Sequence, residues 1–218
     1  MLILTRTDAG RRLAAGLGPL LVEPPVILAL SANGAQVAGE IAAAFRAPLD
    51  IMAVRRLEVP GRAHAIFGAV ADGTTILDED RVRELGLPEE YVRGLVAAAS
   101  ADTAHCAAAW REGADPINLA GRTVVLVDDG QCEVLAVTAA ARALATCGAS
   151  RVLFVAPTGS RMLAARMAAL GIETLFLIEP GAPFGALVRD ANFAQTTPHE
   201  VGTLVRRSRP DLTGVKGP

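Results

Sequence analysis

Apolar runs and amphipathic segments alternate along most of the chain. Apolar runs rich in Val, Ile and Leu lie at residues 24–30, 48–57, 122–129, 150–160 and 172–180, and each predicts a strand. Segments with helical periodicity lie at residues 35–47, 135–148 and 161–171, and the last two end at glycine. This alternation is typical of an α/β fold whose parallel sheet is covered on both faces.

The middle of the chain departs from this alternation. Residues 65–77 predict a β-hairpin with Asp72-Gly73 at its tip. Residues 79–112 predict one or two helices that are broken near residues 86–90, with Pro88 opening the second. From Gly181 onward the pattern is irregular. In parallel sheets ligands bind at the carboxyl ends of the strands, which places residues 31–35, 55–64 and 128–135 at a candidate cleft.

Composition narrows the class of protein. The 218 residues are 51% hydrophobic and 20% charged, which is ordinary for a soluble globular protein with one sizeable core. A net charge of −2 argues against partners such as nucleic acid or an anionic membrane. The start lacks the order of a secretory signal, and no apolar run approaches the ~18–20 residues of a membrane span. We expect a cytoplasmic protein.

The three cysteines are odd in number and follow no ligand spacing, which argues against a disulfide framework and a zinc site. We therefore predict no metal site from the sequence. Cys132 lies near an expected helix start, a position that lowers the pKa of a thiol. Its reactivity stays open, because no histidine is close to it in sequence.

Three stretches carry a resemblance to a known family. They are LALSANG at residues 28–34, VRRLEVPGRAH at 54–64 and VDDGQCEVLA at 127–136. In this order they are similar to LALPRGG, VRKLGAPGNPE and VDDGIATGAT of the type I phosphoribosyltransferase family, in its bacterial phosphoribosyltransferase-like branch. Further likeness at residues 9–17, 67–73, 109–130 and 180–201 extends the resemblance over roughly residues 9–205.

The resemblance implies an α/β fold with a type I phosphoribosyltransferase-like core. This core is a central, mostly parallel sheet flanked by helices, with a small hood. It also implies one domain over residues 1–205, a loose tail at 206–218, and a homodimer. The family's reaction displaces pyrophosphate from phosphoribosyl pyrophosphate (PRPP) with a nitrogen nucleophile, and Mg²⁺ assists.

The resemblance further implies roles for individual residues. Asp128 and Asp129 match the paired acids that hold the ribose hydroxyls, and the loop after them matches the one that holds the 5′-phosphate. The glycine-rich loop near residue 33 and the basic pair of the second loop match elements that hold pyrophosphate and Mg²⁺. The candidate ligand-binding residues are Asn33, Gly34, Arg55, Arg56, Asp128, Asp129, Gly130 and Glu133.

Several of these elements depart from the family pattern. Glu133, Val134 and Leu135 stand where the family has Thr, Gly and a small residue, and Ala32 replaces the pyrophosphate-facing arginine. A phosphate nest needs small residues so that the backbone can approach the oxygens. A carboxylate ~4 Å from a phosphate charge costs about 1 kcal/mol in water and about 4 at an effective dielectric of 20.

These departures lead to three hypotheses of function. The first is a protein with a degenerate PRPP loop that lacks PRPP-dependent transfer and binds a nucleotide or sugar ligand, or acts as a regulatory partner. The second is an active transferase on a sugar donor without a 5′-phosphate, and the third is transfer from PRPP itself. Asp128 and Asp129 could instead be structural caps, and Arg55 and Arg56 could form only surface ion pairs. We also expect Glu133 to cap the following helix with its own carboxylate.

Overall fold

The computed structural model describes residues 5–62, 64–131, 133–178 and 195–209. At its centre lies a sheet of five strands in the order β2-β1-β6-β7-β8, and every neighbouring pair is parallel. The strands are β1 (Val26–Ala29), β2 (Leu49–Ile51), β6 (Thr123–Val127), β7 (Arg151–Ala156) and β8 (Glu173–Phe176). The predicted α/β class and parallel sheet are confirmed. Most of the expected hood, at residues 180–201, lies outside the described residues.

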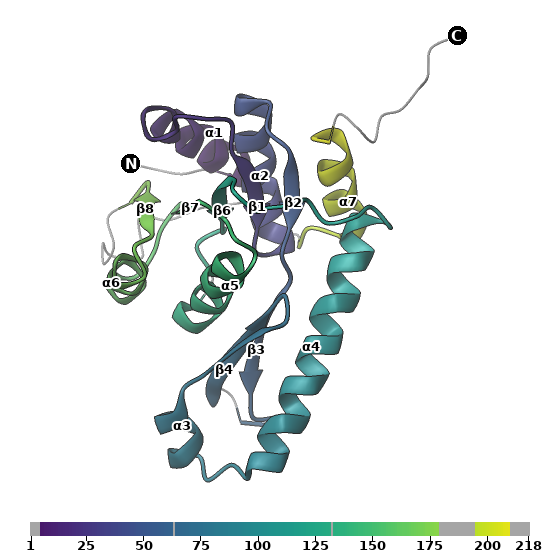
Figure 1. The fold of residues 1–218 in the computed structure, drawn as a ribbon, viewed down its shortest axis with the longest axis vertical. Helices are drawn as coiled ribbons and strands as arrows, with labels where there is room; N and C mark the ends of the chain where they lie inside the picture. Colours follow the sequence, from purple (N-terminus) through teal and green to yellow (C-terminus); the bar gives the residue numbers. More distant parts are fainter. Residues whose placement is uncertain (1–4, 63, 132, 179–194, 210–218) are drawn as a thin grey trace.

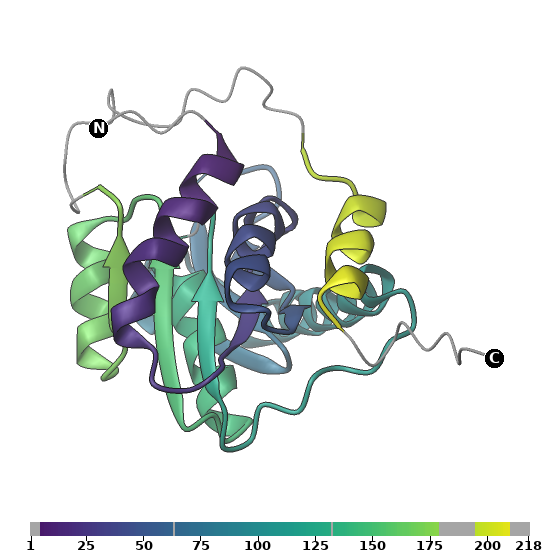
Figure 2. The same ribbon diagram turned by 90° about the horizontal axis from the view of Figure 1, so that it is seen from above.

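Helices cover both faces of this sheet (Figures 1 and 2). Helices α1 (Arg6–Leu17) and α2 (Ala32–Phe45) pack on one face, and a 3-10 turn, η1 (Gly18–Leu20), follows α1. Helices α5 (Val134–Thr146) and α6 (Arg161–Ala169) pack on the other face. Alternate strand residues supply the two cores: Ile27 and Val125 face α1 and α2, whereas Leu28 and Leu126 face α5. All four strand residues are at most 2% exposed, as expected for a doubly covered sheet.

A second, antiparallel sheet lies beside the first. It contains β3 (Val54–Glu58), β4 (Ile66–Ala71) and β5 (Thr74–Leu77), and it packs against α3 (Glu79–Glu84) and α4 (Glu89–Arg111). The predicted hairpin is confirmed, with Asp72 (φ 43°) and Gly73 (φ 74°) at its tip. The predicted helical region forms two helices, and Pro88 is the N-cap of the second.

Two predictions about strands and helices are wrong. Residues 48–57 form two strands in different sheets rather than one, because Met52 and Ala53 end the pairing with β1 and the chain turns into β3. The region after Gly181, for which the sequence predicts irregular structure, contains helix α7 (Pro198–Arg207). A capping box between Thr197 and Glu200 starts this helix, and its sequence signal was readable.

The described chain continues past the expected end of the domain at residue 205. Helix α7 runs to Arg207 and Arg209 is buried, while residues 210–218 of the expected tail lie outside the described residues. Within the described part of the chain, no helix combines the length and apolar character that crossing a membrane requires.

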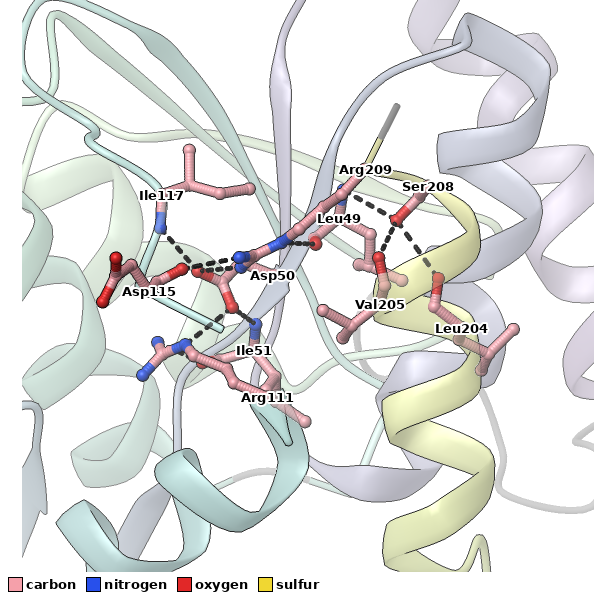
Figure 3. A network of polar contacts seen from close by, with 10 residues as sticks. All are labelled: Leu49, Asp50, Ile51, Arg111, Asp115, Ile117, Leu204, Val205, Ser208 and Arg209. Carbon is pink, nitrogen blue, oxygen red and sulfur yellow. Dashed lines mark hydrogen bonds and ion pairs between the residues drawn. The ribbon is translucent and has the colours of Figure 1, made fainter. Parts of the chain in front are cut away.

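Buried Asp50 in β2 joins distant parts of the fold (Figure 3). Its carboxylate lies 2.8 Å from Nε of Arg111 at the end of α4 and 2.8 Å from Nη2 of Arg209 after α7. It also accepts backbone N–H bonds from Ile51 and from Ile117, at 2.8 and 2.9 Å. The two arginines donate onward to backbone carbonyls, including that of Asp115. One side chain thus fixes β2, α4, α7 and the segment that leads into β6.

We expect Asp50→Asn to destabilise the fold by about 3–5 kcal/mol, because it leaves two buried guanidinium groups without their counter-charge. Urea unfolding followed by circular dichroism measures this change. Asp80→Asn is the matched control: Asp80 pairs with Arg83 and its side chain is 81% exposed, so its loss should cost under about 1 kcal/mol. Equal stability of the two variants would contradict the role assigned to Asp50.

Candidate ligand-binding site at the carboxyl edge of the sheet

The candidate site lies where the order of the strands reverses. From β1 the chain continues through α2 to β2 on one side, while β6 pairs with β1 on the other. Leu30 donates its N–H to the carbonyl of Val127, so the loops that follow β1 and β6 lie together. A Cβ on Gly34 would lie 3.3 Å from that carbonyl oxygen and 3.5 Å from the Cα of Asp128. Glycine at position 34 therefore permits α2 to start against the acidic pair.

Asp128 and Asp129 follow β6 directly and are both shielded from solvent. Asp128 is 1% exposed, and its Oδ2 accepts the N–H of Gly130 at 2.6 Å. The side chain of Asp129 is 6% exposed, and its Oδ1 accepts the N–H of Gln131 at 3.3 Å. Gly130 adopts φ 91°, a conformation that favours glycine, and this turn brings the two N–H groups to the carboxylates.

The surroundings of Asp129 raise its pKa from the ordinary 3.8 to about 6. Burial is the main cause, and the neighbouring charge of Asp128 adds to it. The guanidinium of Arg6, the N–H of Gln131 and the side chain of Asn33 act in the opposite direction. Strongly shifted acids of this kind are found often at functional sites.

Arg6 is a residue of this site that the sequence analysis missed. It is the first residue of α1, its Nε lies 3.9 Å from Oδ2 of Asp129, and its side chain is 13% exposed. Residues 6 and 129 lie far apart in the sequence, and no local motif predicts that they are in contact. Only the fold reveals it.

Asn33 ties the site to the C-terminal segment. It lies in the first turn of α2, after the N-cap Ser31, whose Oγ accepts the N–H of Gly34. The Oδ1 atom of Asn33 accepts the N–H and the hydroxyl of Thr196, at 3.0 and 3.2 Å. One amide therefore connects the first turn of α2 to the segment before α7.

Glu133 does not cap α5 with its carboxylate, and our expectation that it does is wrong. It is the N-cap residue by backbone geometry, but its side chain makes no capping bond. Its Oε1 instead accepts a hydrogen bond from Nη1 of Arg56 in β3, at 2.9 Å. A full guanidinium charge attracts the carboxylate more strongly than the partial charges of the helix N-terminus.

The two arginines of β3 point in different directions, as neighbours in a strand must. Arg56 reaches the start of α5, whereas Arg55 pairs with Asp102 of α4 and donates from Nη2 to the Sγ of Cys106, at 3.1 Å. The structure therefore places Arg55 against α4, not beside the acidic pair. The expected cleft loop at residues 55–64 is also wrong in its first part, which is strand β3. Cys132 lies outside the described residues.

The arrangement suits recognition of hydroxyl groups. Two shielded carboxylates, an amide and a guanidinium converge at the switch point of a doubly covered parallel sheet, which is where such folds bind ligands. Carboxylates accept hydrogen bonds from sugar hydroxyls, and their number fits a diol. Among the described residues, no group of three or more His, Cys, Asp or Glu side chains could hold a metal ion. The fold and site define an α/β protein with an acidic switch-point site.

Comparison with known proteins agrees with the α/β fold. No protein-family model matches the chain. The chain is 34% identical over 208 residues to a Mycobacterium tuberculosis protein named "Putative phosphoribosyl transferase", a match that covers 95% of this chain and 47% of the relative. The chain therefore spans about half the length of the curated relatives it matches.

Two solved structures extend the comparison. The protein TT1426 from Thermus thermophilus is 28% identical with a TM-score of 0.76, over 94% of this chain and 98% of that one. A hypothetical protein from Neisseria gonorrhoeae, with bound ppGpp, shares the fold at 12% identity and a TM-score of 0.52, over 95% of this chain and 97% of that one. These similarities support the resemblance to the type I phosphoribosyltransferase-like family.

We expect Asp129→Asn to stabilise the protein at pH 7.5. Because the folded state binds the proton of Asp129 more tightly than the unfolded state does, ionised Asp129 costs up to about 3 kcal/mol above pH 6. The asparagine removes that cost but weakens the partner of Arg6, so a net gain of about 1–2 kcal/mol is expected. Urea unfolding should show the gain shrinking as the pH falls through 6 toward 3.8.

Asp102→Asn is the control for this prediction. Hydrogen bonding and charge attraction from Arg55 lower the pKa of exposed Asp102, so its ionised form is favoured in the folded state. Its replacement should give no stabilisation at pH 7.5. A destabilised Asp129→Asn at that pH would show that the acidic pair is a structural cap instead of a strained ligand site.

Proposed function

We propose that this protein binds a ribose-containing ligand through Asp128 and Asp129 and does not transfer phosphoribose from PRPP. The observation that carries the proposal is the start of α5. Helix α5 begins at Val134, directly after Glu133, where the resemblance would place the 5′-phosphate loop. The acidic pair is retained beside it.

The first turn of α5 is unsuited to a phosphate for two reasons. The side chains of Val134 and Leu135 are partly buried against the core of the α5 face, so they occupy space that small residues would leave open. The carboxylate of Glu133 adds a negative charge, and its pairing with Arg56 also engages a guanidinium that could otherwise contact phosphate. The acidic pair retains what the hydroxyl groups of a ribose-containing ligand require.

The runner-up is an active transferase on PRPP or on a sugar donor without a 5′-phosphate. A sugar donor without a 5′-phosphate is compatible with the start of α5, because it needs no phosphate-binding loop there. Relatives named as phosphoribosyl transferases support transfer chemistry in general terms. The described residues include the acidic pair, which would hold the donor's hydroxyls in either case.

Calorimetric titration distinguishes these functions. We expect no heat from PRPP, with or without Mg²⁺, and measurable binding of at least one ribonucleoside, ribonucleotide or ribose phosphate. The panel includes ppGpp, because the gonococcal protein of this fold was solved with it bound. Binding should weaken at least about tenfold in Asp128→Asn, since a charged acceptor of a ligand hydroxyl is lost. Micromolar, Mg²⁺-dependent binding of PRPP would overturn the proposal.

A second set of variants tests the phosphate argument directly. Glu133→Thr alone should leave PRPP unbound, because the side chains of Val134 and Leu135 remain. The triple variant Glu133→Thr, Val134→Gly, Leu135→Ala removes both obstacles and should gain measurable affinity for PRPP. Glu58→Thr, at an exposed position of β3, is the control. Tight binding of PRPP by Glu133→Thr alone would show that these two side chains do not block the site.

The homodimer that the resemblance implies stays a prediction, as does the regulatory role. Sedimentation of the purified protein measures the first. The regulatory role predicts that adding this protein to an active family member changes that member's sedimentation.

A further inference from the structure

Helices α2 and α7 lie side by side and run in the same direction (Figures 1 and 2). Near their starts, Oδ1 of Asn33 in α2 accepts the N–H of Thr196, the residue before the N-cap of α7. Near their ends, Oγ of Ser208, the C-cap of α7, accepts the N–H of Leu49, three residues after the C-cap of α2. The C-termini of the two helices therefore lie at the same end of the pair.

A groove of about 650 Å³ lies along these two helices and is lined by ten residues. Its apolar lining consists of Gly39, Ala42 and Ala43 of α2, Ala47 directly after it, and Leu204 of α7. The two helices approach closely at Gly39, where a Cβ would lie 3.0 Å from Cδ2 of Leu204. Because the apolar lining from α2 is only glycine and alanine, no large apolar side chain of this helix fills the groove.

Two arginines lie at the C-terminal end of the groove. Arg46 is the C-cap of α2 and Arg207 is the last residue of α7, and both line the groove. Both are exposed, and within the described part of the chain neither guanidinium has a hydrogen-bond or ion-pair partner. The carboxylate of Glu40, which also lines the groove, is paired with Arg11 of α1 at 2.9 Å. This end of the groove therefore carries a net positive charge.

Arginine at a helix C-terminus can serve stability alone, because that end carries a partial negative charge. The backbone at residue 46 argues for more than this role. Arg46 adopts φ 49°, a conformation in which helix ends usually have glycine and in which a larger residue is strained. The last carbonyls of α2 are already bonded, because Ala43 accepts the N–H of Arg46 and Ala42 accepts that of Ala47. A strained arginine whose charge has no partner among the described residues indicates a functional role.

We propose that this groove binds a small organic anion, in which an apolar body carries a carboxylate or phosphate group. The anionic group contacts Arg46 and Arg207, because guanidinium groups bind such oxyanions through paired N–H donors. The apolar body lies along α2 against Ala43 and Leu204, where its burial is favourable. From Arg46 back to Gln36, the other end of the lining, α2 spans roughly 15 Å, which leaves room for the alkyl chain of octanoate.

The size of the groove favours a small ligand over a second protein. Pockets for small molecules enclose about 300–1,000 Å³, and a volume of about 650 Å³ falls within that range. A standard protein interface takes about 20–30 residues from each partner, whereas ten residues line this groove. None of these ten belongs to the loops that follow β1 and β6, so the inference does not rest on the proposed function.

NMR titration of the ¹⁵N-labelled protein with four probes tests this inference. The probes are octanoate, octyl phosphate, the neutral analogue octan-1-ol and acetate, each below the concentration at which it forms micelles. Octanoate and octyl phosphate should shift the resonances of α2 and α7 and bind about tenfold more tightly than octan-1-ol, as expected for charge-assisted contacts. Acetate should show no measurable binding, because it lacks the apolar chain.

The double variant Arg46→Gln, Arg207→Gln tests the anionic end of the groove. It should lose the preference for the two anions and bind octanoate no more tightly than octan-1-ol. Arg166→Gln is the matched control, because Arg166 is also exposed in the last turn of a helix, α6, on the other face of the sheet. This control should leave all four affinities unchanged.

Ala43→Leu tests the apolar part of the groove. The larger side chain occupies the space of the alkyl chain, so the affinities for octanoate and octan-1-ol should both fall at least about fivefold. Ala44→Leu is the matched control, because Ala44 is also exposed on α2 but does not line the groove. It should bind both probes as the wild-type protein does.

Three results would overturn the inference: no shifts in α2 and α7, equal affinities for octanoate and octan-1-ol, or a retained preference in the double arginine variant. A dimer in sedimentation that Ala43→Leu dissociates would also overturn it, because the groove would then be an interface between two copies of the chain. Ribose-containing ligands should not compete with octanoate. Failure of the proposed function and failure of this inference are therefore observed separately.

Discussion

The buried carboxylate of Asp50 is the constraint on which the arrangement of the remote segments depends. A charge at 2% exposure is tolerated only when it is paired and fully hydrogen-bonded, and here Arg111, Arg209 and two backbone N–H groups meet that requirement. These donors come from the end of α4, from the chain after α7 and from the segment before β6. Because these donors converge on β2, an edge strand, they hold the second sheet and helix α7 against the parallel sheet.

This anchoring also affects the candidate site at the carboxyl edge of the sheet. The segment held through residue 117 leads into β6, which carries Asp128 and Asp129 at its end. The helix held through Arg209 begins next to Thr196, which bonds Asn33 in the site. Two of the parts that build the ligand site are thus fixed by a network that touches no ligand. In functional sites of this kind, a rigid scaffold holds in place the residues that would contact a ligand.

Much of the fold was readable from the sequence, because strand and helix periods alternate clearly over β6, α5, β7 and α6. The acidic pair was also readable, since adjacent acids after a buried strand fall at the switch point. The contacts that complete the site could not be predicted from the sequence. The pairings of Arg6 with Asp129 and of Arg56 with Glu133 cross 123 and 77 positions of sequence, and no local pattern encodes them. The prediction of one strand over residues 48–57 was wrong for a related reason, because strand propensity does not show which sheet a residue joins.

Under the proposed function, the pairing of arginines with acids explains how the fold keeps the acidic pair without an affinity for PRPP. Arg55 and Arg56 are engaged by Asp102 and Glu133, so the basic pair does not present free charge to a ligand. Arg6 is engaged differently, because its partner Asp129 is a shielded acid whose ionised form is disfavoured by burial. A hydroxyl group that donates to Asp129 would stabilise that ionised form and strengthen its attraction for Arg6. The acidic pair and Arg6 therefore act as one unit, in which a diol bound by Asp129 and the ion pair with Arg6 would reinforce each other.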